Sequence, residues 1–254
     1  MPVGETTVLH AGYEPRSYRR RMRAEGLVGF GVAIGESDLW IWAERELRSE
    51  AISVLQRLRA DVLAQLERQP AFLTSLVPLP CPQNSPPIIR AMCQAAEAAG
   101  VGPMAAVAGA IAQAMAEALE PLSPEVIVEN GGDLYLITRR ERLVAIVAGR
   151  SSLSGKLAIR VPANQRLAVC TSSGTQGHSL SFGRADAAVV AAGDGALADA
   201  VATALGNRVQ GPADIEAAVK WARSLPGVRQ AVVLCGDRMA IAGELEVVPA
   251  ATRP

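Results

Sequence analysis

An aspartate and a threonine, Asp199 and Thr203, lie four residues apart in the otherwise apolar segment 197–205. On a helix this spacing puts both side chains on one face. Carboxylate and hydroxyl oxygens are the hard ligands that Mg²⁺ prefers, so the pair is a candidate metal site. The alternative is structural: Thr203 bonds back to the Asp199 carbonyl, and Asp199 pairs with an arginine because an unpaired buried carboxylate is costly.

A second candidate begins where a strand-like apolar run ends at Thr171. Ser172, Ser173 and Gly174 follow, and the segment continues to His178, one of two histidines in the chain. Hydroxyls and open backbone amides could cradle phosphate oxygens, and His178 could donate a hydrogen bond or carry a proton. A surface loop with a solvated histidine explains the same residues equally well.

Glycines mark two further segments. In Asn130-Gly131-Gly132-Asp133, an Asn-Gly pair between apolar runs indicates a hairpin turn. Consecutive glycines also leave backbone N–H groups uncovered, so an anion or a ligand ring could approach them. The segment from Gly102-Pro103 through Gly109 predicts a helix start that favours phosphate, although close helix packing also explains its glycines.

Hydrophobic periodicity predicts the elements that would carry these residues. A hairpin is expected first, then an amphipathic helix over 46–68, a proline-rich crossing over 70–87, and two further helices. Short strands dominate the second half, interrupted by two helices. The pattern predicts an α+β protein with a mainly antiparallel sheet. We expect residues 1–23 to be a polar, arginine-rich arm and 24–254 to form one domain or two closely packed halves. The predicted strands are 27–34, 39–43, 126–129, 134–138, 143–148, 156–161, 167–171, 187–192, 230–235 and 238–241, and the remaining helices are 88–99, 104–119, 195–205 and 213–224.

Composition restricts the class of function. The 254 residues carry 25 basic and 25 acidic side chains, which argues against a general nucleic-acid binder. No run of about 18 strongly apolar residues occurs and no signal-peptide pattern opens the chain, so we expect a cytoplasmic protein without a membrane partner. Its 4 cysteines are far apart, without the spacing of a zinc site or a disulfide framework.

Taken in order, the four segments resemble the ApbE-like superfamily of flavin transferases. The family's GAIAKG helix corresponds to 109–113, its Gly-Gly strand end to 130–133, its Thr-Ser-Gly strand end and histidine to 171–178, and its A-D-A-x-A-T-A helix to 198–204. The match spans about 104–206. The whole chain, with Glu36-Ser37-Asp38-Leu39 and the segment from Gly102, looks still more like a bacterial and archaeal branch of that superfamily whose function is not established.

The resemblance implies an α+β fold and a site for FAD or FMN with Mg²⁺, since transferases of the family split FAD and attach FMN to a Ser or Thr of a target protein. Asp199, Thr203 and the Ala110 carbonyl would then hold the metal. Gly131, Gly132 and Thr171 to Gly174 would line the flavin-nucleotide site, and His178 would be the catalytic histidine near the flavin. Two departures weaken this assignment: Gln113 replaces the motif's lysine, and Ser179-Leu180-Ser181 replaces the family's acid and proline after the histidine.

Three hypotheses remain open at this stage. The first is a flavin-nucleotide protein with Mg²⁺-dependent transferase or pyrophosphate-cleaving activity. The second, prompted by Gln113, is a non-catalytic module that binds a nucleotide or another small anion. The third is an assembly protein whose alanine-rich helices and hairpin edges form a homo-oligomer.

Overall fold

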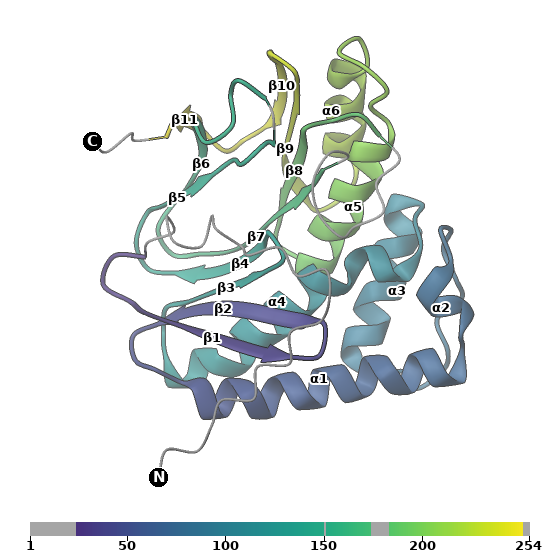
Figure 1. Cartoon of the computed structure of the whole chain (residues 1–254), viewed down its shortest axis with the longest axis vertical. Coiled ribbons are helices and arrows are strands. Elements are labelled where there is room, and N and C mark those ends of the chain that lie inside the picture. The colour runs from purple at the N-terminus through teal and green to yellow at the C-terminus, as the bar shows by residue number, and fades with distance from the viewer. Residues whose placement is uncertain (1–23, 150, 174–182, 251–254) are drawn as a thin grey trace.

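The computed structural model describes residues 24–149, 151–173 and 183–250 (Figure 1). The arm predicted at 1–23 therefore lies outside the described residues, as do Gly174 and His178. In the described part of the chain, no single helix has both the length and the apolarity to cross a membrane. One pair of helices bent by 106°, Pro87–Ala99 with Pro103–Leu122, meets those two criteria only when taken together.

Eight strands form one antiparallel sheet in the order β1-β2-β3-β4-β7-β8-β9-β10. Short turns join three of the neighbouring pairs, β1 with β2, β3 with β4 and β9 with β10, as the apolar runs separated by turn residues predicted. A smaller sheet has the order β11-β6-β5. The bounds are β1 Val28–Ile34, β2 Ser37–Ala43, β3 Val126–Asn130, β4 Asp133–Thr138, β5 Arg142–Ala145, β6 Leu157–Val161, β7 Gln165–Ser172, β8 Ala187–Ala192, β9 Val228–Cys235, β10 Arg238–Gly243 and β11 Val247–Pro249.

The helices follow the apolar periodicity closely. The predicted helix over 104–119 is divided, since its first turn is a 3-10 helix and the α-helix starts at Val107. The proline-rich crossing contains one helical turn, α2. This helix has only 4 residues, which is too short to show a periodicity in the sequence. The bounds are α1 Arg48–Arg68, α2 Ala71–Thr74, α3 Pro87–Ala99, η2 Pro103–Ala106, α4 Val107–Leu119, η3 Glu120–Leu122, α5 Gly195–Asn207 and α6 Ile215–Ser224.

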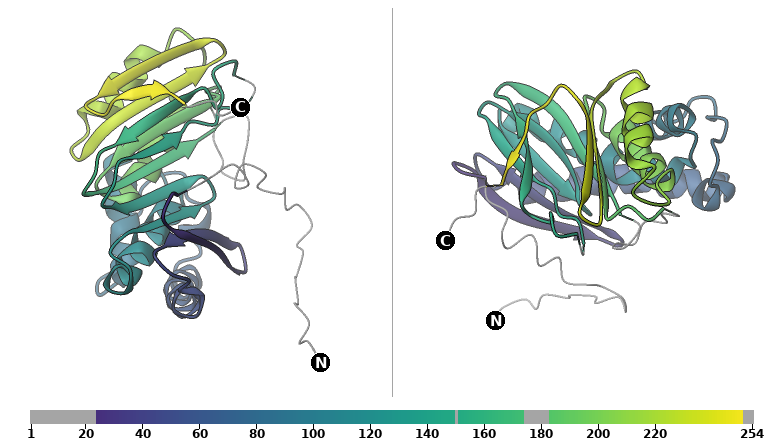
Figure 2. Two further views of the ribbon diagram at one scale, coloured as in Figure 1. Left: turned by 90° about the vertical axis from the view of Figure 1, so that its left-hand side faces the viewer. Right: turned by 90° about the horizontal axis from the view of Figure 1, so that it is seen from above.

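The molecule has three layers, with the helices on one face of the large sheet and the small sheet on the other (Figure 2). Alternate residues of β7 show that each face of the large sheet is covered by a different layer. Ala168 and Cys170 belong to the core shared with the helices, whereas Leu167 and Val169 belong to the core shared with the small sheet. Because both faces of the strand are covered, its apolar run is nearly continuous. The structure thus confirms the α+β class and the mainly antiparallel sheet.

Helix α5 is the element that links the predicted site to the sheet. It follows β8 after a short turn and packs against β7, α3 and α4 (Figure 1). Since β7 and β8 are antiparallel, a helix that returns from the end of β8 runs in the same direction as β7. Ser172, at the end of β7, alternates with Ala168 and Cys170 and so faces the layer that contains α5, whereas Thr171 alternates with Leu167 and Val169.

Candidate functional site

Helices α4 and α5 cross at two glycines. A side chain at Gly109 would place its Cβ against the Gly195 carbonyl oxygen and 2.8 Å from the Asp199 Cβ. A Cβ on Gly195 would lie 2.5 Å from the Gly109 carbonyl oxygen. Both distances are too short for real Cβ atoms, so only glycine permits this approach. The crossing brings Asp199 of α5 to the first turn of α4.

The Asp199 carboxylate accepts hydrogen bonds at the start of α4. Its Oδ2 is 2.9 Å from the Gly109 amide nitrogen, and the Ala108 backbone also donates to the carboxylate. These N–H groups belong to the first turn of a helix, where no carbonyl of the same helix can accept them. Among the described residues, the observed partners of Asp199 are backbone amides of a neighbouring helix, and no ion pair with an arginine is observed there.

A second carboxylate, Asp133, lies close to the first. Asp133 is buried, and its Oδ1 accepts the Thr171 N–H at 3.0 Å. Burial and the nearby Asp133 raise the pKa of Asp199 well above its usual value, and the Gly109 and Ala108 amides only partly offset this. Burial also raises the pKa of the Cys170 thiol, as do Asp133 and Asp199 beside it. A positive charge in this region would stabilise both carboxylates.

The hairpin turn between β3 and β4 is fastened to the same helix end. Gly131 and Gly132 have φ angles of 69° and 105°, a region that favours glycine. The Gly132 N–H donates to the Glu129 carboxylate at 2.8 Å, and the Asn130 side chain donates to the Ala108 carbonyl at 3.1 Å. The turn predicted from Asn-Gly is confirmed, and it lies beside the start of α4.

The end of β7 contributes a buried hydroxyl. Ser172 pairs with Ala188 and shares its face of the sheet, the face that the helices cover. The side chain is 4% exposed, and within the described residues its Oγ has no hydrogen-bond partner. Thr171 and Ser173 are partly exposed on either side of it. A buried hydroxyl without a protein partner indicates a place where a ligand or an ion could bind.

The remaining predicted metal ligands lie along the two helices. Thr203 is one turn beyond Asp199 on α5 and is buried, and Ala110 follows Gly109 within α4. In the part of the chain that the structure describes, no three His, Cys, Asp or Glu side chains form a group able to hold a metal. A metal here would depend on Asp199 together with hydroxyl and carbonyl oxygens.

Gln113, the residue that replaces the motif's lysine, fastens the start of α5. Its Oε1 accepts the Gly195 N–H at 2.6 Å, and its Nε2 donates to the Glu117 carboxylate at 2.9 Å. A lysine has no acceptor and could not bind this N–H. The substitution therefore exchanges a cation near the site for a neutral cap on the helix.

Two cavities lie away from this cluster. One, of about 310 Å³, is lined by Thr138, Gln165 and Arg166, at the opposite end of β4 and β7 from Asp133 and Ser172. The other, of about 260 Å³, lies between Ala213 of the loop before α6 and Arg238 of β10. Neither coincides with the predicted residues, although the segment 174–182 that follows Ser173 lies outside the described residues.

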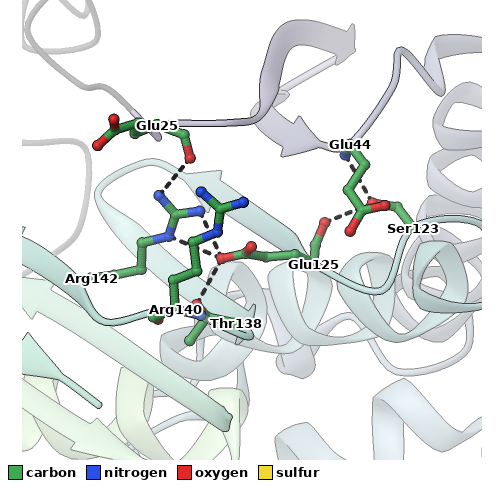
Figure 3. Close-up of polar contacts among 7 residues, drawn as sticks. All are labelled: Glu25, Glu44, Ser123, Glu125, Thr138, Arg140 and Arg142. Carbon is green, nitrogen blue, oxygen red and sulfur yellow. Dashed lines mark hydrogen bonds and ion pairs between the residues drawn. The ribbon is translucent and has the colours of Figure 1, made fainter. Parts of the chain in front are cut away.

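A buried ion pair near the first cavity was not anticipated from the sequence (Figure 3). Glu125 accepts from Arg142 through Nη2 at 2.7 Å and Nε at 3.0 Å, and its Oε1 is 2.8 Å from the Thr138 hydroxyl. Arg142 also donates to the Glu25 carbonyl at 3.0 Å. Since these hydrogen bonds satisfy the pair, its role is to join β3, β4, β5 and the residues before β1.

Comparison with known proteins agrees with the architecture. A family model described as AbpE bacteria matches residues 19–239. The UPF0280 protein of Methanocella arvoryzae is 40% identical over 214 residues, covering 84% of this chain and 87% of that protein. A UPF0280 protein of Methanopyrus kandleri is 41% identical over 219 residues, covering 84% of this chain and 89% of that protein.

Two solved structures have a similar fold at low sequence identity. The flavinyl transferase ApbE of Pseudomonas stutzeri, in its apo form, has a TM-score of 0.53 at 15% identity and covers 85% of this chain and 94% of its own. The flavin transferase ApbE of Vibrio cholerae has a TM-score of 0.53 at 12% identity, covering 85% of this chain and 96% of its own.

Proposed function

The chain belongs to the family described as AbpE bacteria, an ApbE-like branch that includes the UPF0280 proteins, and we propose that it binds a flavin nucleotide beside Asp199. The observation that carries the proposal is the convergence of four segments. The α4 start, the β3–β4 turn, the end of β7 and α5 are joined by the bonds of Asp199, Asn130 and Asp133. The resemblance assigns the ligand site to these same segments.

The donors fit a hard divalent cation. Asp199 uses part of its carboxylate for two backbone N–H groups, and a carboxylate has about four acceptor positions. Thr203 supplies a hydroxyl on the same helix face, and buried Ser172 has an unsatisfied oxygen. Mg²⁺ takes such ligands and usually keeps several waters. We assign Asp199 and Thr203 as the side chains that would hold it and the Ala110 carbonyl as a third ligand.

The protein's own groups would orient the nucleotide. Exposed Gly131 and partly exposed Gly132 present backbone to a ligand without side-chain obstruction. We assign partly exposed Thr171 and Ser173, which flank Ser172 at the end of β7, as further residues that would line the site. His178 is our candidate for moving a proton near the flavin. Bound Mg²⁺ would supply charge neutralisation at a pyrophosphate, as in other phosphoryl transfers.

A non-catalytic nucleotide-binding module is the second candidate. Gln113 favours it, because a neutral amide that already caps α5 cannot supply the cation that the motif's lysine would. Such a module would hold the nucleotide without cleaving it.

One experiment distinguishes these functions. The purified full chain is incubated with FAD, with and without MgCl₂. Flavin retained after desalting is measured by fluorescence, and AMP and FMN are measured by chromatography. We expect retained flavin in wild type and a large loss in Asp199→Asn, with Asp214→Asn as a control. Asp214 also accepts two backbone N–H groups, at 2.9 and 3.0 Å, but outside the cluster.

The outcomes separate cleanly. AMP that forms only with Mg²⁺ supports the transferase or pyrophosphate-cleaving activity. Retained FAD without AMP supports the binding module. A protein that retains neither FAD nor FMN under either condition contradicts the proposal.

A further inference from the structure

The cavity beside Arg166, named here the Arg166 cavity, lies at the ends of β4 and β7 that are remote from the flavin site. Its volume of about 310 Å³ is near the lower end of the range typical of small-ligand sites, about 300–1,000 Å³. Arg166 pairs with Ile137 across the two strands, and Gln165 pairs with Thr138. Since Asp133 begins β4 and Thr138 ends it, about 17 Å of extended strand separate the two sites.

One wall of the Arg166 cavity is fixed by contacts within the protein. The Arg166 Nη2 is 2.5 Å from Oε1 and 2.6 Å from Oε2 of Glu120, which ties η3 to β7. After η3, the buried Ser123 hydroxyl donates to the Glu125 carbonyl at 2.7 Å (Figure 3). Pro124, which lines the cavity, lies between these two residues and is held with them. The wall is therefore in place before any ligand binds.

The charges that line the Arg166 cavity do not cancel. Arg166 is paired with Glu120, whereas Arg139 is exposed and forms no ion pair with any residue that the structure describes. Two guanidinium groups and one carboxylate leave one net positive charge. Gln165 accepts from Arg229 through its Oε1 at 2.8 Å, which leaves its Nε2 as a donor. The polar lining is thus complementary to one negative charge.

The same cavity has an apolar part. Ile137, which is 5% exposed, belongs to the core shared with the helices, and its outer surface lines the cavity. Pro124 is exposed on the wall. An apolar group of a ligand would cover this surface and gain the free energy of removing it from water.

We propose that the Arg166 cavity binds a small monocarboxylate that carries a short apolar chain. The carboxylate accepts from the Arg139 guanidinium, whose planar fork matches its two oxygens, and the chain lies against Ile137 and Pro124. A phosphate dianion carries more charge than the lining offsets and has no group for the apolar surface. The binding is non-covalent and needs neither the flavin nor a metal.

Saturation-transfer NMR on the full-length chain tests the proposal with sodium butyrate as the probe. Butyramide, which has the same chain and a neutral head, is the matched control ligand. We expect a saturable butyrate signal in the wild type and a much weaker butyramide signal. Inorganic phosphate added at the butyrate concentration should leave the butyrate signal in place.

Three variants assign the signal to the Arg166 cavity. Arg139→Gln should raise the butyrate Kd by about tenfold, because it removes charged hydrogen bonds to the carboxylate. Glu120→Gln should change the Kd in the opposite direction, lowering it by up to about fivefold, because it removes the one acid among the lining residues. Arg238→Gln, which changes an exposed arginine of the second cavity, should leave the Kd unchanged.

Each component of the proposal can be contradicted. A wild type without a saturable butyrate signal, or an Arg139→Gln variant that binds butyrate as the wild type does, overturns the site. Equal binding of butyramide, or displacement of butyrate by phosphate, overturns the assignment of a monocarboxylate ligand.

Discussion

Replacing Asp199 with asparagine removes a titratable carboxyl group but keeps an oxygen that can accept the Gly109 N–H. In the wild type this oxygen is 2.9 Å from the Gly109 nitrogen, and Asp133 lies close enough to raise the pKa of Asp199. Asp199→Asn should therefore preserve the contact between α4 and α5 and alter the response to a divalent cation. The two readouts are the melting temperature with and without MgCl₂ and its dependence on pH.

The effect of the cation can be estimated from binding linkage. A ligand at about 100 times its dissociation constant stabilises the native state by about 2.7 kcal/mol. For a chain of this size, about 2–4 °C of melting temperature corresponds to each kcal/mol, so saturating Mg²⁺ should raise the wild-type value by about 5–10 °C. Differential scanning fluorimetry over a MgCl₂ series should show this rise in wild type and Asp214→Asn, and little of it in Asp199→Asn.

The sign of the pH effect follows from the raised pKa. An acid whose pKa is higher in the folded state contributes stability below its unfolded pKa, and this contribution is lost as pH rises through the folded value. In chelator-treated protein, Asp199→Asn should therefore gain stability relative to wild type as pH rises above the ordinary pKa of an aspartate. An equal Mg²⁺ response in both proteins, or a pH-independent difference between them, would refute the role given to Asp199.

The packing and the buried ion pair give two further predictions. Glu125→Ala should destabilise the fold by about 3–5 kcal/mol in urea unfolding, because it leaves Arg142 buried without its acid; a cost below about 1 kcal/mol would contradict this. Gly109→Ala should cost about 1–3 kcal/mol by forcing α4 away from Gly195, and it should also weaken flavin retention. Gly193→Ala, where an added Cβ meets nothing within 4 Å, is the matched control and should be near neutral.

Local signals in the sequence were sufficient to predict most of the helices, strands and turns of the fold. The Asn-Gly turn, the apolar spacing of 46–68 and the glycine after Ala99 each correspond to an observed turn or helix end. The Gly100 φ of 73° is the left-handed conformation that ends α3. Strand β11 was missed because three residues, one of them proline, carry no periodicity.

The partners of the predicted site residues were harder to anticipate. The sequence indicated that Asp199 needs a partner, but its donor is a backbone amide 90 positions away, fixed by the glycine crossing of two helices. Asp133 was visible directly after the glycine pair, yet only the register of β4 against β7 places it at the Thr171 amide. Pairings of this kind depend on tertiary packing, which local patterns do not encode.

An experimental structure of the chain crystallised with FAD and MgCl₂ tests the central claim most directly. The account predicts flavin-nucleotide density bounded by the Gly131–Gly132 turn, Ser172 and the Asp199–Thr203 face of α5, with a cation beside the Asp199 carboxylate. Flavin bound instead in the cavity beside Arg166, or no flavin at saturating concentration, would contradict it.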